Sequence, residues 1–429
     1  MGGSPNDTLR KRWSAATRFG FRFAFVYLIL YNFPFPLYYV PGVNRVLYWY
    51  VPVLHTAVPW VGSHLLRLKT PITNFSFGSG DKLYDYVRVL CFLVSAFAVS
   101  VVWSFADRKR PNYELMHAWL RVYIRFALGT VLVGYGSAKL FPSQFSSPAF
   151  LRLTEPFGQA SPMGLLWTFM GASRPYCVIA GATEFVSGLL LFVPWTEALG
   201  AILGAAVMSN VVALNFCYDV AVKQYSLHLL LMCLFLGWSG ITRAIKLLVW
   251  NQAQMVRETP LFARSSLQKG FLAAQVVLGI ILAATNLNDV HQQTVRDQNM
   301  LATLPFGGFW RVDEFKVDDD VSKNVVSGVP QWTQFIVDSP FVVLIQGEGG
   351  FRLVSRWTVD PDKKTLILAQ ADNGSEAILG VESPAQDRLI LRGPWHGHLI
   401  EARFHREDMP KFALMTRGFH WINEYPFNR

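Results

Sequence analysis

The stretch LGTVLVGYGSAKLFPSQF (Leu128–Phe145) begins as an apolar helix and ends with Lys139 beside a leucine and a phenylalanine. Tyr135 stands four residues before Lys139, a spacing that puts both side chains on one face of a helix. Apolar runs of similar length recur along the chain, and about 20 such residues are enough to cross a ~30 Å hydrocarbon core. Of the 429 residues, 52% are hydrophobic and 16% are charged, whereas soluble domains carry roughly 25% charged residues. The sequence therefore predicts a polytopic membrane protein.

Hydropathy on both sides of this stretch predicts an all-α transmembrane bundle of seven spans. They are expected at residues 19–40, 85–105, 117–140, 175–195, 198–217, 225–248 and 269–287. A further apolar stretch, Val46–Leu66, contains Pro52, Pro59 and several aromatic residues. That composition is typical of interfacial or re-entrant segments, so we expect it to lie on the outer face or dip into it.

The charge distribution predicts the orientation of the bundle. Residues 306–429 carry 14 Lys+Arg against 17 Asp+Glu, and the remaining 305 residues carry 25 against 12. The basic residues cluster in the N-terminal segment with Arg10 and Lys11, in Asp107–Arg110, and in the loop with Lys246 and Arg257. Basic loops mark the cytoplasmic side, so a bacterial inner-membrane protein with a cytoplasmic N-terminus and an extracytoplasmic C-terminal domain is expected. Nucleic acid is excluded as a partner because the positive charges border apolar spans; membrane lipids are the expected surroundings.

Beyond Asn286 the pattern changes to eight short segments rich in β-formers, from FGGFWRVDEF to KFALMTRGFHWI. Eight strands are enough for a small all-β barrel or sandwich, and Gly308-Phe309-Trp310 matches the G-x-W start of lipocalin-like barrels. The expected domains are an N-terminal part at 1–116, a bundle at 117–290 and the β-rich domain at 306–429. The closing segment Arg417–Arg429 is interpreted as the last strand of the barrel, with packing onto the outer mouth near Lys139 as the alternative.

Several polar residues fall inside the predicted spans. Counting 1.5 Å of rise per residue places Tyr135, Lys139, Asn215, Asp219 and His228 in or beside the outer leaflet. The same count places Glu184 and Arg125 near the middle of the bilayer, where an isolated charge costs about 2.5–3.5 kcal/mol on insertion scales. We therefore expect Arg125 and Glu184 to face each other, or each to reach a polar neighbour such as Asn210 or Tyr123.

Each of these residues also has a purely structural interpretation. Lys139 could extend to the outer headgroups, as lysines at the ends of spans often do. His228 could be a hydrogen-bonded histidine of the bundle, and Glu184 could serve only to pair with a basic residue. The functional interpretation depends on several spans placing polar side chains in one leaflet.

The segments YGSAKLF (Tyr135–Phe141) and GATEFVSGLLLF (Gly181–Phe192) resemble the DoxX family of bacterial membrane proteins. The resemblance covers roughly residues 117–248, and the whole chain is similar to longer DoxX-like proteins with a β-rich tail. It implies a four-helix core with Lys139 and Glu184 at the family's characteristic positions. It also implies quinone-linked oxidation of thiosulfate, as in the related DoxD subunit, or thiol redox defence. The chain departs from the latter chemistry because it has no Cys-x-x-Cys pair.

Two functions are predicted from these residues. The first is a membrane redox component that handles a lipid quinone and a membrane or periplasmic redox partner. Glu184 and His228 would be its catalytic residues, and the substrate would be bound by Tyr135, Lys139, Arg125, Asn210, Asn215 and Asp219. The alternative is a non-catalytic anchor that docks partners and presents a β-barrel able to hold a small ligand. A bundle followed by an outer β-rich domain is also the layout of the vitamin K-dependent γ-carboxylase group, although no motif of that group is found. No metal site is expected, and no oligomeric state is predicted.

Overall fold

A computed structural model describes residues 12–39, 43–73, 78–252, 260–318, 329–360, 362–369, 376–408 and 410–427. The chain divides into two compact units. The helical unit comprises Met1–Phe141 and Pro175–Val290, and the barrel unit comprises Pro142–Arg174 and His291–Arg429. Arg10, Lys11 and Arg257, which the orientation argument uses, lie outside the described residues.

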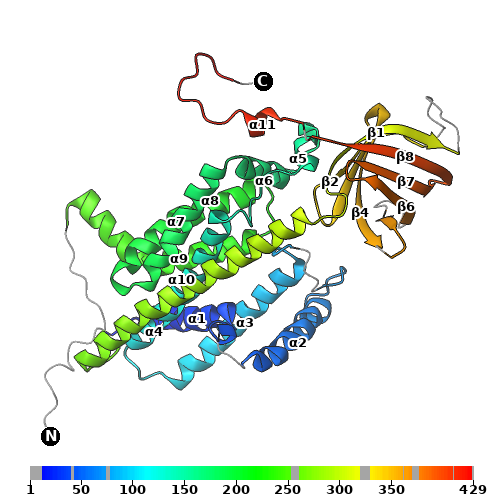
Figure 1. The fold of residues 1–429 in the computed structure, drawn as a ribbon. Helices are drawn as coiled ribbons and strands as arrows, with labels where there is room; N and C mark the ends of the chain where they lie inside the picture. Colours follow the sequence, from blue (N-terminus) through cyan, green and yellow to red (C-terminus); the bar gives the residue numbers. More distant parts are fainter. Residues whose placement is uncertain are drawn as a thin grey trace, which may run out of the picture. The chain divides into compact units, whose positions relative to one another are not determined.

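In the part of the chain that the structure describes, seven long helices follow the predicted spans, and an eighth, α2, lies in the separate stretch Val46–Leu66 (Figure 1). They are α1 (Ala15–Asn32), α2 (Asn44–Trp60), α3 (Leu83–Ala106), α4 (Glu114–Leu140), α7 (Arg174–Phe192), α8 (Glu197–Cys217), α9 (Lys223–Trp250) and α10 (Ser265–Ala302). Six of the seven predicted spans, all except α4, are long and apolar enough to cross a membrane. Six such helices indicate a membrane protein, because their exposed apolar side chains would be unfavourable in water.

Two helices add detail to the sequence-based prediction: the stretch expected on or in the outer face is helical, and one span is longer than expected. The stretch Val46–Leu66 is helical, with α2 followed by a π-helical turn at Val61–Leu65. Helix α10 continues to Ala302, beyond the expected span end at residue 287. Its polar second half contains neither glycine nor proline after Gly279, so nothing in the local sequence stops the helix where the apolar run ends.

Helix α4 forms the core of the helical unit. Its residues from Ile124 to Val133 are almost all buried, on every side of the helix. A helix that is apolar all round is expected in an interior rather than at a surface. Outward-facing positions of the neighbouring helices are also apolar, including Phe97, Val102 and Phe105 on α3 and Leu248 on α9.

The C-terminal domain is a closed antiparallel barrel of eight strands in sequential order. They are β1 (Gly308–Val317), β2 (Trp332–Val337), β3 (Val342–Gly347), β4 (Arg352–Asp360), β5 (Thr365–Ala369), β6 (Glu376–Ala385), β7 (Arg388–Trp395) and β8 (His398–Glu407). Strand β8 closes the barrel on β1, with Phe309 opposite Glu407 and Val317 opposite Ile400. The sandwich alternative is therefore wrong, and the all-β prediction is confirmed.

The prediction of eight strands was right in number but wrong in two places. The segment QFIVDSPFVVLIQ contains two strands, β2 and β3, because Ser339 and Pro340 turn the chain between them. The last predicted strand does not form: within 410–427 the structure has only the short helix α11 (Ala413–Thr416). Since β8 already closes the barrel on β1, no strand edge is left for Arg417–Phe427 to pair with.

The barrel interior is filled by apolar side chains. Trp332, Phe335, Trp395 and Phe404 are almost fully buried there, together with aliphatic residues from every strand between β3 and β8. Small eight-stranded barrels have room for side chains alone or for one small ligand. The packed interior speaks against a carrier role for the inside of this barrel.

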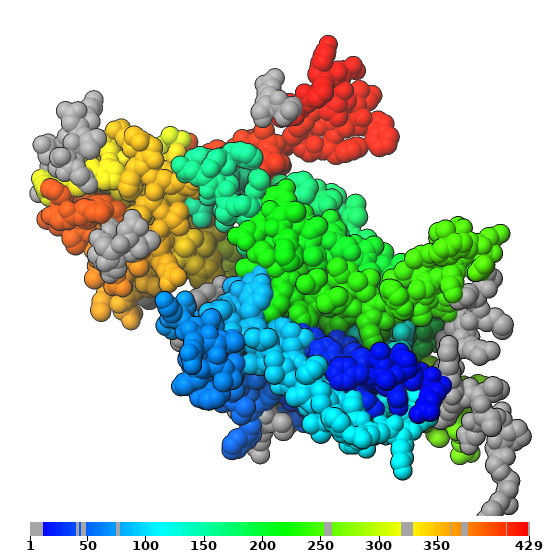
Figure 2. Space-filling view, turned by 180° about the vertical axis from the view of Figure 1, so that it is seen from behind, coloured from blue at the N-terminus to red at the C-terminus, as the bar shows by residue number. Residues whose placement is uncertain are grey.

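The loop between α4 and α7 belongs to the barrel unit. It contains α5 (Phe150–Leu153) and α6 (Pro162–Ala172), and Figures 1 and 2 show α5, in aquamarine, against the barrel. The buried ring of Phe150 packs on Phe309, Ile336 and Leu344. Asp338 accepts a hydrogen bond from the backbone N–H of Phe150 at 2.5 Å, and Arg352 donates one to the carbonyl oxygen of Leu151. The loop is thus anchored to the barrel by an apolar contact and by hydrogen bonds.

Candidate functional site

A buried ion pair joins α4 to α7. The Nζ atom of Lys139 lies 2.7 Å from Oε2 of Glu184, and both side chains are less than a tenth exposed. Two buried charges pay a large desolvation cost, which only close pairing offsets. Lys139 therefore does not extend to the headgroups, and Glu184 is paired with Lys139 rather than with Arg125.

Glycines explain why these two side chains meet. A Cβ atom on Gly136 would stand 2.5 Å from the backbone nitrogen of Phe185, and one on Gly181 would stand 2.7 Å from Cβ of Lys139. Helices α4 and α7 therefore approach each other backbone to backbone, as small residues permit within membranes. Their crossing brings Lys139 level with Glu184 and leaves Arg125 two turns farther along α7.

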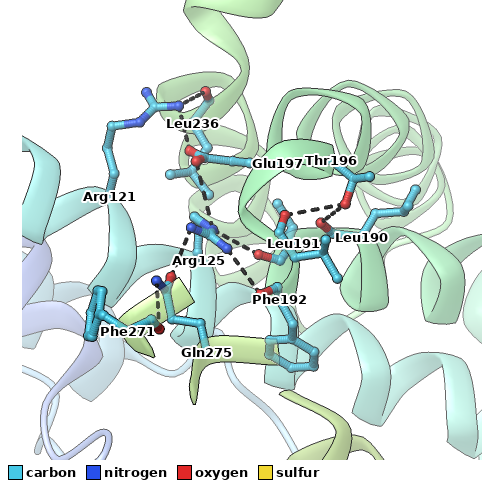
Figure 3. Close-up of polar contacts among 11 residues, drawn as sticks. Arg121, Arg125, Leu190, Leu191, Phe192, Thr196, Glu197, Leu236, Phe271 and Gln275 are labelled. Carbon is cyan, nitrogen blue, oxygen red and sulfur yellow. Dashed lines mark hydrogen bonds and ion pairs between the residues drawn. The ribbon is translucent and has the colours of Figure 1, made fainter. Parts of the chain in front are cut away.

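Arg125 has a different role from the one predicted. Its guanidinium donates to the carbonyl oxygens of Leu191 at 2.8 Å and Phe192 at 3.1 Å, at the end of α7 (Figure 3). The last carbonyls of a helix have no partner within the helix, and a cation there also complements the helix dipole. Glu197, in the first turn of α8, lies 3.7 Å from Arg125 and accepts a hydrogen bond from Arg121. Gln275 of α10 adds a bond to Arg125 at 3.2 Å, so this network fastens four helices together.

Tyrosines extend the site from the ion pair. The ring centroid of Tyr135 lies 5.5 Å from Nζ of Lys139, a cation–π distance. The rings of Tyr135 and Tyr225 are 6.4 Å apart, and Tyr225 also lies near Tyr31 of α1. Tyr225 and Tyr31 therefore connect the ion pair with the first helix of the unit.

His228 lies at the other end of this row. Its Nδ1 is 2.7 Å from the carbonyl oxygen of Gln224, so Nδ1 must carry the proton. The hydroxyl of Tyr27 lies 2.6 Å from Nε2, which accepts its hydrogen when the imidazole is neutral. The imidazole stacks on Tyr31, with ring centroids 4.0 Å apart. His228 is thus held between two tyrosines, with a hydrogen bond to Tyr27 and a stacking contact with Tyr31.

We call this set the tyrosine row, and it comprises Tyr27 and Tyr31 of α1, Tyr135 and Lys139 of α4, Glu184 of α7, and Tyr225 and His228 of α9. Four of its members, Tyr135, Lys139, Glu184 and His228, were predicted from the sequence. The three other tyrosines were missed, although Tyr27 and Tyr31 stand at a helical i, i+4 spacing and Tyr225 lies three residues before His228.

The structure does not bring the other predicted residues into the row. Asn210 is exposed on α8, and Asp219 is exposed and pairs with Lys223 at 2.7 Å. Asn215 is buried, and its Nδ2 has no hydrogen-bond partner within the described residues. No group of three or more His, Cys, Asp or Glu side chains that could hold a metal occurs among the described residues.

Comparison with known proteins finds a relative that matches part of the chain. The chain is 36% identical over 106 residues to an uncharacterized protein, YwoB, of Bacillus subtilis (strain 168). The matched region is 24% of this chain and 66% of that protein, just under two thirds of its length. No family model and no solved structure matches the chain.

Proposed function

We propose that this chain is a DoxX-like membrane protein that binds the headgroup of a lipid quinone at the tyrosine row and exchanges protons with it. The buried pair of Lys139 and Glu184, 2.7 Å apart, is the observation that supports the proposal. A quinone headgroup requires hydrogen-bond donors at its two oxygens and a nearby group that takes up or releases protons.

The residues divide these tasks. The Lys139 ammonium and the Tyr135 hydroxyl are the donors to a ring oxygen, and the Glu184 carboxylate is the proton acceptor. Oxidation of a quinol releases two protons and two electrons, so the electrons must pass to a membrane or periplasmic redox partner. In its neutral form, His228, whose Nε2 lies 2.6 Å from the Tyr27 hydroxyl, is the second proton acceptor at the far end of the row.

The proposed topology has seven spans: the six helices that are apolar enough by composition, and α4 in addition. Helix α4 has 27 residues, and its three basic side chains, Arg121, Arg125 and Lys139, lie within 4 Å of acidic residues of α7 and α8. Four spans, α7 to α10, then separate the α4–α7 loop from the barrel, so both lie on one side of the membrane. The compact unit formed by that loop and the barrel agrees with this parity. From the basic loops, that side is outside the cytoplasm of a bacterium, and the N-terminus is cytoplasmic.

The proposal is tested by quinol oxidation in membranes that contain the full chain. Glu184→Gln removes the proton acceptor with little change in shape and should abolish the activity. Glu114→Gln, at the opposite end of α4, is the matched control and should leave it unchanged. Full activity of the Glu184→Gln variant would contradict the proposal.

A non-catalytic anchor is the second candidate. It is favoured by the contacts of Phe150 with Asp338 and the neighbouring strands, because they attach the α4–α7 loop to the barrel and involve no chemistry. Under this alternative, membranes with the wild-type chain would show no quinol oxidation above background. Glu184→Gln and Glu114→Gln would then leave the background rate unchanged.

A further inference from the structure

A pocket of about 610 Å³ opens at the end of the barrel where α10 leads into β1. In an up-and-down barrel, the starts of odd strands and the ends of even strands meet at one end. The pocket is accordingly lined by the start of β1, the ends of β2, β6 and β8, and the chain that connects α10 to β1. Its volume is in the range of small-molecule sites, about 300–1,000 Å³.

One wall of the pocket is apolar. Leu304, Phe306 and Trp310 line it. The indole N–H of Trp310 donates to the carbonyl oxygen of Phe306 at 2.7 Å, which fixes the connecting chain beside the barrel. Ser383 and Gln386 line the pocket as neutral polar groups. A ligand that fits such a wall has an apolar body.

Arg406 supplies the positive charge of the pocket. The other arginines of β1, β7 and β8 each have a carboxylate oxygen within 3.0 Å, and they are Arg311, Arg388, Arg392 and Arg403. Arg406 has no such carboxylate among the residues that the structure describes. It is the one guanidinium of these strands that faces a pocket instead of a partner.

Gly308 creates the space in which the Arg406 guanidinium lies. A Cβ atom on Gly308 would stand 3.1 Å from Nε of Arg406, and the φ angle of Gly308 is +139°, a conformation that other residues rarely adopt. A side chain at this position would require the guanidinium to shift, so the glycine leaves room for the charge here.

Asp338 is the acidic residue of the pocket lining, and it is already engaged. Its carboxylate accepts the backbone N–H of Phe150. Burial raises its pKa above the usual value for an aspartate, although the hydrogen bonds from Phe150 and Leu151 oppose this shift. The carboxylate therefore serves the α4–α7 loop, and Arg406 remains for an incoming anion.

We propose that this pocket binds an amphipathic monocarboxylate, with its apolar chain on the wall of Leu304, Phe306 and Trp310 and its carboxylate on Arg406. An arginine and a carboxylate form charge-assisted hydrogen bonds, often in bidentate geometry. This site is separate from the tyrosine row and does not depend on the function proposed for it.

The test uses the full chain in lipid nanodiscs, with empty nanodiscs as the background for partition into lipid. Equilibrium dialysis with octanoate, octanol and octylamine compares three ligands that share a chain and differ in charge. Octanoate should bind most tightly, because only it can pair with Arg406. Equal binding of octanol, or tighter binding of octylamine, would overturn the proposal by assigning recognition to the apolar wall or to Asp338.

Variants identify the residue that binds the carboxylate of the ligand. Arg406→Gln should weaken octanoate binding by about tenfold or more and leave octanol binding unchanged, which also shows that the pocket is still folded. Arg388→Gln removes an arginine of β7 that is not among the pocket-lining residues and should change neither. Octanoate binding that survives Arg406→Gln, or is absent from the wild-type protein, would refute the assignment.

Discussion

The helical unit has an ion pair in its interior, whereas the barrel has its ion pairs on its exterior. The helical unit buries an ion pair, Lys139–Glu184, and turns apolar side chains such as Phe97 and Val102 outward. The barrel buries tryptophans and aliphatic residues and carries its ion pairs, such as Arg388–Asp313, on the outside. Each unit faces its surroundings with the side chains that those surroundings solvate, lipid for one and water for the other. The same ionic contact therefore contributes very differently to the stability of the two units.

The largest expected effect comes from removing one partner of the buried pair. Glu184→Leu leaves the Lys139 ammonium buried without its carboxylate, which should cost about 3–5 kcal/mol of unfolding free energy. Replacing both, with Lys139→Met and Glu184→Leu, should recover most of that loss because no charge is left buried. Unfolding of the purified protein in mixed micelles measures the difference. A double variant as unstable as the single one would show that the pair is not the source of the cost.

Truncation inside the barrel should have a similar or slightly smaller effect. Leu391→Ala removes a fully buried side chain of β7 and should cost about 2–5 kcal/mol, according to how far the surroundings collapse. Hydrogen exchange during denaturation, measured on peptides from residues 308–407, follows the unfolding of the barrel alone. A cost below this range would indicate a barrel interior that is looser than the structure shows.

An ion pair on the outside of the barrel should contribute little. Arg388 and Asp313 are 2.7 Å apart, but both side chains are more than a third exposed. Arg388→Gln should therefore change the stability by about 0.2–1 kcal/mol, far less than the loss at Glu184. A similar cost at both sites would break the contrast between the two units.

The smallest effect is a change in pH dependence at the barrel surface. Asp318 has a pKa below its usual value because His398 and the backbone N–H of Leu399 are hydrogen-bonded to its carboxylate. A lowered folded-state pKa contributes stability above the unfolded-state pKa, and this stability is lost as the pH falls through the folded-state pKa. Asp318→Asn should flatten this part of the acid-unfolding curve. An unchanged curve would show that His398 does not hold the carboxylate in solution.

Local patterns in the sequence were sufficient to predict most of the fold. The bounds of α7 and α8 agree closely with the predicted spans, because hydropathy along a single helix is a local property. The strand pattern likewise predicted the β-rich domain. It missed the turn at Ser339 and Pro340, and it predicted a strand beyond Lys411 that cannot pair in a barrel already closed by β8.

The candidate site was harder to predict because its contacts depend on helix packing. Residue counting placed Glu184 and Arg125 at similar depths, but the crossing of α4 and α7 at Gly136 and Gly181 matches Glu184 with Lys139. Arg125 instead caps the end of α7, a role set by where that helix stops. The tyrosines of α1 were missed because nothing in the sequence indicates that α1 packs beside α9.

The anchoring of the α4–α7 loop also sets an order of events during synthesis. Phe150 is made 188 residues before Asp338, which accepts its N–H in the folded protein. At translation rates of roughly 5–20 residues per second, about 10–40 s pass between the synthesis of Phe150 and that of Asp338. During that interval the Phe150 side chain lacks the strands that bury it in the folded protein. A folding factor that binds exposed apolar side chains would act at this stage.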